Sequence, residues 1–335
     1  MARSESDTVR LEAAAAAKRL HRHLGIEKRV SEVGGSVDVF EAISDLDIPL
    51  VFKKLDSALG LYLPSPAQGI LITTERTLNI QRFTAAHELG HATLDHEGSV
   101  DQEIFERGPF QPQNGRDLKE VAADAFAAEF ILPRWLYRLH VRKQGWSVSH
   151  LRNPDIVYQL SLRLGASYDA TCWGLLSHQI LDRRDINILR DEKVAVMKRK
   201  LGEGHRPSSS WADVWRITER DNGSTITGTE LDLVQLEFHE NASSGSAWDI
   251  APLTEAGLEV LSDASEFSRD PLVYGAESTR KIVARPTVAQ QFGIRLRETR
   301  PWSHDVDAEV ALNLAFNGAE KVGWSRVERS RRGLD

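Results

Sequence analysis

The chain has very little cysteine and no long apolar run. A single cysteine, Cys172, cannot form an internal disulfide, which favours a reducing compartment. No apolar stretch approaches the length of a membrane span, and the first 20 residues lack the apolar centre of a secretory signal. These absences predict a cytoplasmic protein with no membrane partner.

An excess of positive charge is also missing. The formal net charge is −7, from 42 basic and 49 acidic residues, which argues against general nucleic-acid binding. With 335 residues the chain is longer than one hydrophobic core usually serves, so we expect two domains.

The most informative segment that is present is HELGH, residues 87–91. His87 and His91 are one helical turn apart, so both imidazoles leave the same helix face and can reach one cation. Glu88 is rotated away from that pair, where it can activate water as a general base without being a ligand. The pattern H-E-x-x-H with these roles is typical of zinc peptidases.

The surroundings of the motif favour a buried helix over a helix with surface histidines. Apolar residues recur at helical spacing on both sides, Asn79 is the predicted N-cap, and residues 95–98 are the predicted stop. Burying two histidines and a glutamate is costly unless a metal ion binds them. We therefore predict zinc on this helix.

A third ligand must come from elsewhere, because catalytic zinc sites hold three protein ligands and leave one position for water. Helical periodicity over residues 117–133 makes this segment the candidate donor. Glu120 could ligate the metal or form a capping box with Asp117. We favour the ligand, with Asp124 on the same face accepting a hydrogen bond from a ligating histidine. Glu129 lies on another face and is predicted to be solvated.

These two segments resemble the ImmA/IrrE family of zinc metallo-endopeptidases. Residues 82–92, RFTAAHELGHA, are similar to the family's RFTxAHELGH helix. Residues 120–133, EVAADAFAAEFILP, are similar to its ExxANxFAAxLLMP helix. The resemblance extends over about residues 10–190. It departs from the family at Asp124, where asparagine is more frequent, and in lacking the N-terminal DNA-binding domain of some members.

The resemblance implies a zinc site in which His87, His91 and Glu120 are the ligands and Glu88 is the general base. It also implies a specific protein substrate, often a helix-turn-helix repressor cleaved under stress. A donor to the oxyanion of the reaction is expected as well. The sequence leaves five candidates for it open: His96, Tyr137, His140, His150 and Tyr158.

Residues 155–179 predict a helix, a tight turn and a second helix, which is the outline of a helix-turn-helix. The second helix begins Tyr168-Asp169-Ala170 and offers no arginine or lysine before Arg183. Asp169 would repel phosphate. We therefore predict a structural unit and no direct contact with nucleic acid.

After about residue 200 the pattern changes from helical to alternating. Residues 201–212 are polar, with glycine, proline and serines, and predict a linker. Strands are predicted at 234–238, 294–296 and 310–316, and a hairpin turn at 221–224. We predict an immunoglobulin-like β-sandwich over 213–325 and a basic, disordered tail over 326–335.

The sandwich resembles chagasin-like cysteine-peptidase inhibitors at two loops. Residues 241–248, NASSGSAW, are similar to the NPTTGxxW loop, and residues 300–302 are RPW, as in the family. The middle loop, 274–278, departs from the family because it has one glycine instead of paired glycines. The resemblance implies a chagasin-like fold, while inhibition of a second peptidase and docking of a substrate both stay open.

Together these patterns predict an α+β protein, with a zincin-like, mainly helical metallopeptidase domain over 1–200 followed by the sandwich. The predicted function is cleavage of a specific protein by a zinc endopeptidase. Two alternatives remain. One is the toxin of a toxin–antitoxin pair, with an antitoxin as partner, and the other is a non-catalytic binding module. The intact Glu88 argues against the latter, since binding alone needs no base.

Overall fold

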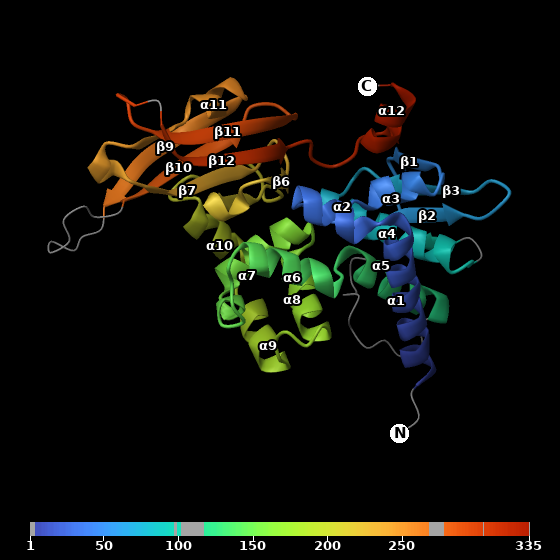
Figure 1. Cartoon of the computed structure of the whole chain (residues 1–335). Coiled ribbons are helices and arrows are strands. Elements are labelled where there is room, and N and C mark those ends of the chain that lie inside the picture. The colour runs from blue at the N-terminus through green and yellow to red at the C-terminus, as the bar shows by residue number, and fades with distance from the viewer. Residues whose placement is uncertain (1–3, 97–98, 102–116, 268–277, 304, 335) are drawn as a thin grey trace.

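The structure, a computed structural model, describes residues 4–96, 99–101, 117–267, 278–303 and 305–334. Its elements form a mainly helical part with a small sheet, followed by a β-sandwich (Figure 1). The predicted α+β class is therefore confirmed. None of the helices in the described segments has the length and apolar character needed to cross a bilayer.

The N-terminal part of the chain forms a small sheet with helices around it, and one strand from the C-terminal end joins this sheet. The sheet has the strand order β13-β1-β3-β2-β4, with β1 parallel to β3 and β2 antiparallel to β3. Its strands are β1 (Leu50–Lys53), β2 (Gly60–Leu63), β3 (Gly69–Thr73), β4 (Ser99–Asp101) and β13 (Gly323–Trp324). The first helices are α1 (Glu5–Leu24), α2 (Ile26–Val33) and α3 (Val39–Asp45).

Two long helices, α4 (Leu78–Thr93) and α5 (Leu118–Ile131), form the centre of the helical part. α4 packs against β2 and β3 on one side and against α5 on another, while α1 packs along α5. The alanine-rich sequence of α1 suits this position, because Ala13, Ala16 and Ala17 are buried and let the two helices approach closely.

The remaining helices of this part lead towards the sandwich. They are α6 (Arg134–Lys143), α7 (Pro154–Leu164), α8 (Tyr168–Ser177), α9 (Arg183–Asp191) and α10 (Val194–Leu201). The predicted helix, turn and helix are α7 and α8, and Gly165 joins them at a φ of 65° that suits glycine. α8 is mostly buried, and Asp169 at its start bonds to Arg190 of α9.

The sandwich consists of two four-stranded sheets, with the strand orders β5-β7-β10-β9 and β6-β12-β11-β8. The first sheet contains β5 (Val214–Ile217), β7 (Leu233–Glu240), β9 (Leu258–Phe267) and β10 (Ser278–Pro286). The second contains β6 (Ser224–Thr227), β8 (Ala247–Asp249), β11 (Gln291–Thr299) and β12 (Val306–Ala315). Strands β7 and β11 contain two of the strand segments predicted from alternation, and β12 contains the third except for its last residue, Phe316.

The hairpin turn predicted at 221–224 is wrong. The strands before and after it, β5 and β6, belong to different sheets, so the chain crosses the sandwich there. The physical reason is Asp221, whose carboxylate is buried and binds groups of the helical part. Gly223 still adopts a positive φ of 73°, but its backbone N–H donates to Ala311 of β12.

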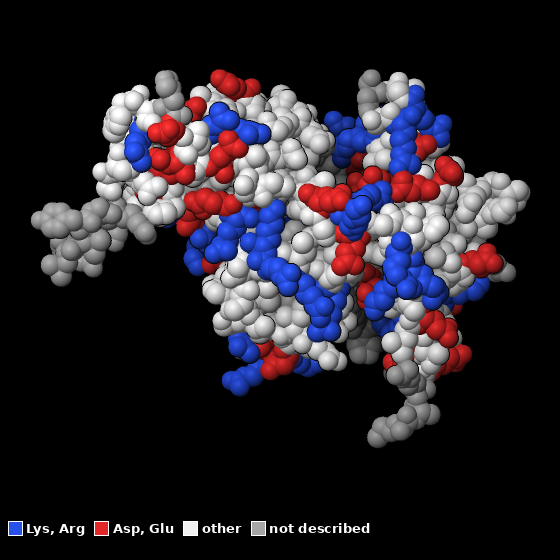
Figure 2. Space-filling model, in the orientation of Figure 1, with Lys and Arg blue, Asp and Glu red and all other residues white. Residues whose placement is uncertain are grey.

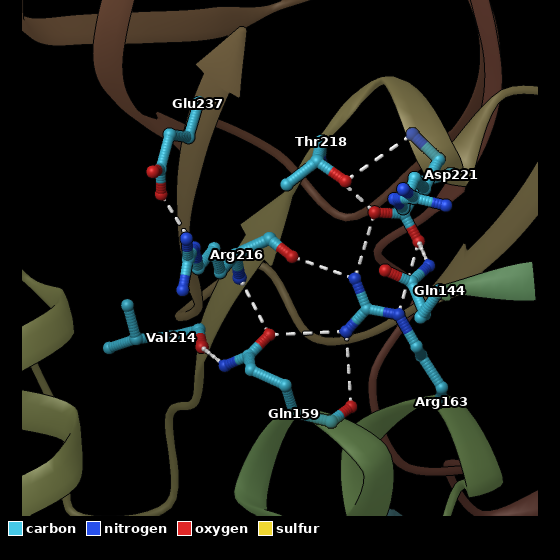
Figure 3. Close-up of polar contacts among 9 residues, drawn as sticks. Gln144, Gln159, Arg163, Val214, Arg216, Thr218, Asp221 and Glu237 are labelled. Atoms are coloured by element: carbon cyan, nitrogen blue, oxygen red, sulfur yellow. Dashed lines mark hydrogen bonds and ion pairs between the residues drawn. The ribbon is translucent and has the colours of Figure 1, made fainter. Parts of the chain in front are cut away.

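A buried polar network joins the sandwich to the helices (Figure 3). Arg163 of α7 and Asp221 form an ion pair in which Nη2 and Oδ2 are 2.8 Å apart and both side chains are buried. The same Arg163 donates to the carbonyls of Gln159 and Arg216, and Gln144 of α6 donates to Asp221. The two buried charges therefore have partners, which fixes the sandwich relative to α6 and α7.

The basic tail predicted over 326–335 as disordered is also wrong. Residues Arg326–Arg332 form α12, which packs against α3, and the preceding β13 pairs with β1. Figure 1 shows this red segment crossing from the sandwich back to the helical part. Ser44 and Asp45 of α3 bond to Glu328 and Arg331, so the charges of the tail have specific partners.

We expect Asp221→Asn to lower the free energy of unfolding by about 3–5 kcal/mol, because it leaves the Arg163 charge buried without its counter-ion. Urea unfolding followed by tryptophan fluorescence measures this loss. The matched control is Glu309→Gln, which breaks an exposed pair with Arg295 on the sandwich surface and should change stability little. Equal losses in the two variants would contradict the role of the buried pair.

Candidate metal centre

Helix α4 holds HELGH in a buried position. It is buried along most of the segment from Gln81 to His91, as the apolar spacing predicts. The predicted N-cap at Asn79 is wrong, since the helix begins at Leu78 after Thr77. The helix ends at Thr93, and Asp95 follows with a φ of 55°, at the predicted stop.

The structure brings His87, His91 and Glu120 together. The Nε2 atoms of the two histidines are 3.1 Å apart. Glu120 places Oε2 3.2 Å from Nε2 of His87 and Oε1 3.4 Å from Nε2 of His91. Ligands held at 2.0–2.1 Å around a tetrahedral zinc lie about 3.3 Å from each other. The spacing of these three side chains therefore fits one zinc ion.

Asp117 caps α5 through its own side chain. Its side chain accepts the backbone N–H of Lys119 at 3.0 Å. The carboxylate of Glu120 instead faces the histidines of α4. The sequence leaves two roles open for Glu120, metal ligand or capping-box residue. The geometry favours the role of metal ligand.

Asp124 contacts His87 as expected for a residue that orients a ligand. Its Oδ1 lies 3.0 Å from Nδ1 of His87, so this ring can present Nε2 to a metal. Burial lowers the pKa of His87, but hydrogen bonds to Asp124 and Glu120 outweigh it and raise the pKa well above its usual value. Burial and the neighbouring His87 lower the pKa of His91 to about 4. A metal ion that binds both rings therefore displaces a proton.

Glycines set two close approaches around the site. A Cβ at Gly90 of α4 would lie 3.2 Å from Cα of Ala123 and Cβ of Phe126 in α5, so glycine lets the two helices meet. A Cβ at Gly60 of β2 would lie 2.7 Å from Oε1 of Glu88. Glu88 is fully buried and lies directly against the strand. The sequence does not predict Gly60 as a site residue, because a glycine at the start of a strand does not by itself indicate contact with Glu88.

Only one of the five candidate oxyanion donors lies beside the metal group. Nδ1 of His96 is 3.0 Å from Nδ1 of His91. The other four bond elsewhere: Tyr137 to Thr171, His140 to Gly35, His150 to Ser147, and Tyr158 to Asp213. The structure therefore leaves His96 as the candidate nearest to the ligands.

Glu129 is not solvated as predicted. Its side chain is 14% exposed and lies 3.5 Å from Lys18 of α1. Burial raises the pKa of Glu129, while the charge of Lys18 lowers it. Close packing of α1 along α5 covers this face of the helix, which periodicity within α5 cannot reveal.

The two inhibitor-like loops of the sandwich lie side by side. Gly245 has a φ of 78°, and a Cβ there would lie 2.2 Å from the ring of Trp302. Arg300 donates to Ser246 at 3.3 Å, and β8 and β11, which border the loops, are paired. Trp302 is nevertheless 73% exposed. Of the middle loop, residues 274–277 lie outside the described residues.

Two histidines and a glutamate on adjacent helices therefore form a group that could hold a metal ion, and a buried glutamate follows the first histidine. Residues 43–175 match the family model described as the IrrE N-terminal-like domain, Peptidase_M78. The chain therefore contains a domain of this metallopeptidase family, and the predicted resemblance is confirmed over this stretch. Among the described residues, His87, His91 and Glu120 form a group that could hold a metal ion.

The C-terminal part has different relatives. Amoebiasin-2 of Entamoeba histolytica is 27% identical over 96 residues, which are 28% of this chain and 77% of that protein. The cysteine protease inhibitor EhICP2 from Entamoeba histolytica is 23% identical, with a TM-score of 0.28. Amebosin is also 23% identical, with a TM-score of 0.24. Each of these two structures covers 31% of this chain and is itself covered to 96%.

We expect Glu120→Ala to lower zinc affinity at least about tenfold, because a three-ligand site loses a ligand. Metal analysis after dialysis, with a competing chelator to measure affinity, gives the result. Glu129→Ala is the matched control on the same helix, since Glu129 pairs with Lys18 and should leave zinc content unchanged. An unchanged zinc content and affinity in Glu120→Ala would show that Glu120 is not a ligand and would favour the capping role.

Proposed function

We propose that the protein is a zinc endopeptidase that cleaves a specific protein substrate. The observation that carries the proposal is the meeting of His87, His91 and Glu120, whose ligand atoms all lie within 4.8 Å of one another. The buried Glu88 beside them adds the base that hydrolysis needs. A site that only stored metal would not require this carboxylate.

The donor set fits zinc. Two imidazoles and one carboxylate are the ligands of gluzincin-type peptidases, and three protein ligands leave a coordination position for water. When bound, zinc supplies Lewis acidity, which activates water and polarises a carbonyl. Asp124 holds the His87 ring in the orientation that presents Nε2.

Glu88 is the proton carrier in this proposal. Its carboxylate is held between α4 and β2, where Gly60 leaves no side chain in the way. From there it accepts a proton from the attacking water and passes it to the leaving amine. The Glu120 side chain is 30% exposed while those of His87 and His91 are 2% and 1% exposed, so the group is open to solvent on the side of α5.

The proposed substrate is a helix-turn-helix repressor, or an antitoxin if the protein is the toxin of a pair. Support comes from the ImmA/IrrE-like motifs at 82–92 and 120–133 and from the matching domain at 43–175. A repressor substrate fits an enzyme of narrow specificity that acts in a regulatory response. The reaction and its residues are the same in both cases.

We expect Glu88→Gln to keep zinc and to lower cleavage of the substrate at least about 10²-fold, because the amide cannot take a proton. The assay is incubation with candidate helix-turn-helix proteins, followed by mass spectrometry of the fragments. Glu129→Gln is the control and should cleave normally. Cleavage by zinc-loaded Glu88→Gln at the parent rate would rule out the proposal.

A second candidate function is inhibition of a cysteine peptidase by the sandwich. It is favoured by the exposed Trp302 packed against Gly245, in loops that resemble those of chagasin-like inhibitors, and by the similarity to Amoebiasin-2. EhICP2 is itself a cysteine protease inhibitor.

We expect the full-length Glu88→Gln protein to inhibit a papain-like peptidase, and Trp302→Ala to weaken this inhibition at least about tenfold, as loss of an interface tryptophan does. Hydrolysis of a fluorogenic peptide by the papain-like enzyme is the measurement. Trp211→Ala, which removes another exposed tryptophan, should leave inhibition unchanged. No inhibition at micromolar concentration would dismiss this function.

A further inference from the structure

A buried arginine at the junction of the two parts forms no direct ion pair with a carboxylate of the described residues, although it interacts electrostatically with Asp38. Arg82 of α4 is only 5% exposed. Its Nη2 donates to Ser36 Oγ at 2.9 Å and to the carbonyl of Val37, and both acceptors are neutral. Burial lowers the pKa of Arg82, while the charge of Asp38 raises it. Arginine keeps its charge in proteins. A buried cation without a direct ion pair is costly, so this position favours an anion.

Arg82 lines a cleft of about 740 Å³. The walls come from α2 and α3, from β6 and β12 of the sandwich, and from the C-terminal segment that contains α12. Figure 2 shows charged side chains of both signs gathering along the junction between the sandwich and the helical part. The volume is in the range of small-molecule sites, about 300–1,000 Å³.

Positive charge predominates in the cleft, where the described lining includes five arginines and three acidic residues. Two of the acids are already paired, Glu41 with Arg29 at 3.3 Å and Glu320 with Arg326 at 3.0 Å. The third, Asp38, accepts backbone N–H groups at the start of α3. Of the three, Asp38 interacts electrostatically with Arg82, but none of them forms a direct ion pair with it.

The guanidinium of Arg82 is held in place. A Cβ at Gly165, in the turn between α7 and α8, would lie 1.9 Å from Nη1. This backbone therefore closes one side of the group, and Ser36 and Val37 hold Nη2 on the other. A rigid guanidinium loses little entropy when it pairs with a planar or tetrahedral anion.

We infer that this cleft binds a small organic anion whose phosphate or carboxylate group pairs with Arg82. Such a ligand would contact α4, α3, the sandwich and the C-terminal segment at once. Gln81, the residue before Arg82, already holds that segment by donating to the carbonyl of Glu320 and accepting its N–H. His87 lies five residues further along the same helix, so binding here stiffens the helix that carries the metal group.

Inorganic phosphate and acetate are the probes, added to the full chain with sodium chloride at matched ionic strength as reference. We expect at least one probe to raise Tm by about 2–4 °C at near-saturating concentration, since a ligand that binds only the folded state stabilises it. The probe with the larger shift identifies the anionic group. No shift beyond the chloride reference with either probe would overturn the inference.

Two variants of Ser36 make the test specific for Arg82. Ser36→Asp places a carboxylate beside Nη2, and we expect it to raise Tm without any added anion and to abolish the response to the probe. Ser36→Asn is its neutral control and should keep the response. A full response in Ser36→Asp would show that the anion binds elsewhere.

Removal of the arginine provides an independent check. Arg82→Met should lose the response, whereas Arg295→Met on the outer face of the sandwich should keep it. If Arg82→Met does not fold, the comparison of Ser36→Asp with Ser36→Asn still tests whether the anion binds at Arg82. Because all readouts are thermal shifts, failure of this inference and failure of the peptidase proposal are distinguishable.

Discussion

The buried contact between Arg163 and Asp221 holds the two parts of the molecule in one arrangement. Two opposite charges lie out of water, and hydrogen bonds from neighbouring amides and to backbone carbonyls satisfy them. Such a network tolerates few alternative geometries, because any shift leaves a buried donor or acceptor without a partner. It fixes the start of the sandwich on α6 and α7. The end of the sandwich is fixed separately, where β13 joins the sheet at β1 and α12 packs on α3.

Helix α4 connects the parts that these contacts position. In its first turns, Gln81 forms hydrogen bonds with the C-terminal segment and Arg82 lines the cleft. Further along it carries His87 and His91, which face Glu120 of α5. The close approach of the neighbouring elements depends on glycine at two points, Gly90 against α5 and Gly60 against Glu88. One rigid helix thus links the junction of the two parts to the candidate metal centre.

Several features could be predicted because they depend on neighbours in the chain. Helices α4 and α5, the α7–α8 pair and strands β7, β11 and β12 follow from periodicity alone. Three of the errors have a common cause in distant partners. The local pattern predicts a hairpin turn at Asp221, but the carboxylate of this residue binds Arg163 at the junction of the two parts. It predicts a solvated basic C-terminus, but Asp45 and Ser44 bind that segment. It predicts an exposed Glu129, but α1 covers this side chain.

The sequence by itself determined two features. One is the pair of histidines at i and i+4 with a glutamate beside them, and the other is the alternating pattern of the sandwich strands. Helical geometry is local, so four residues of spacing suffice to place two imidazoles on one face. Only the tertiary structure decided which carboxylate lies beside the two histidines, how closely β2 approaches Glu88, and that the last residues return to the first sheet. Those outcomes depend on packing between residues far apart in the chain, and no local pattern encodes the distance between them.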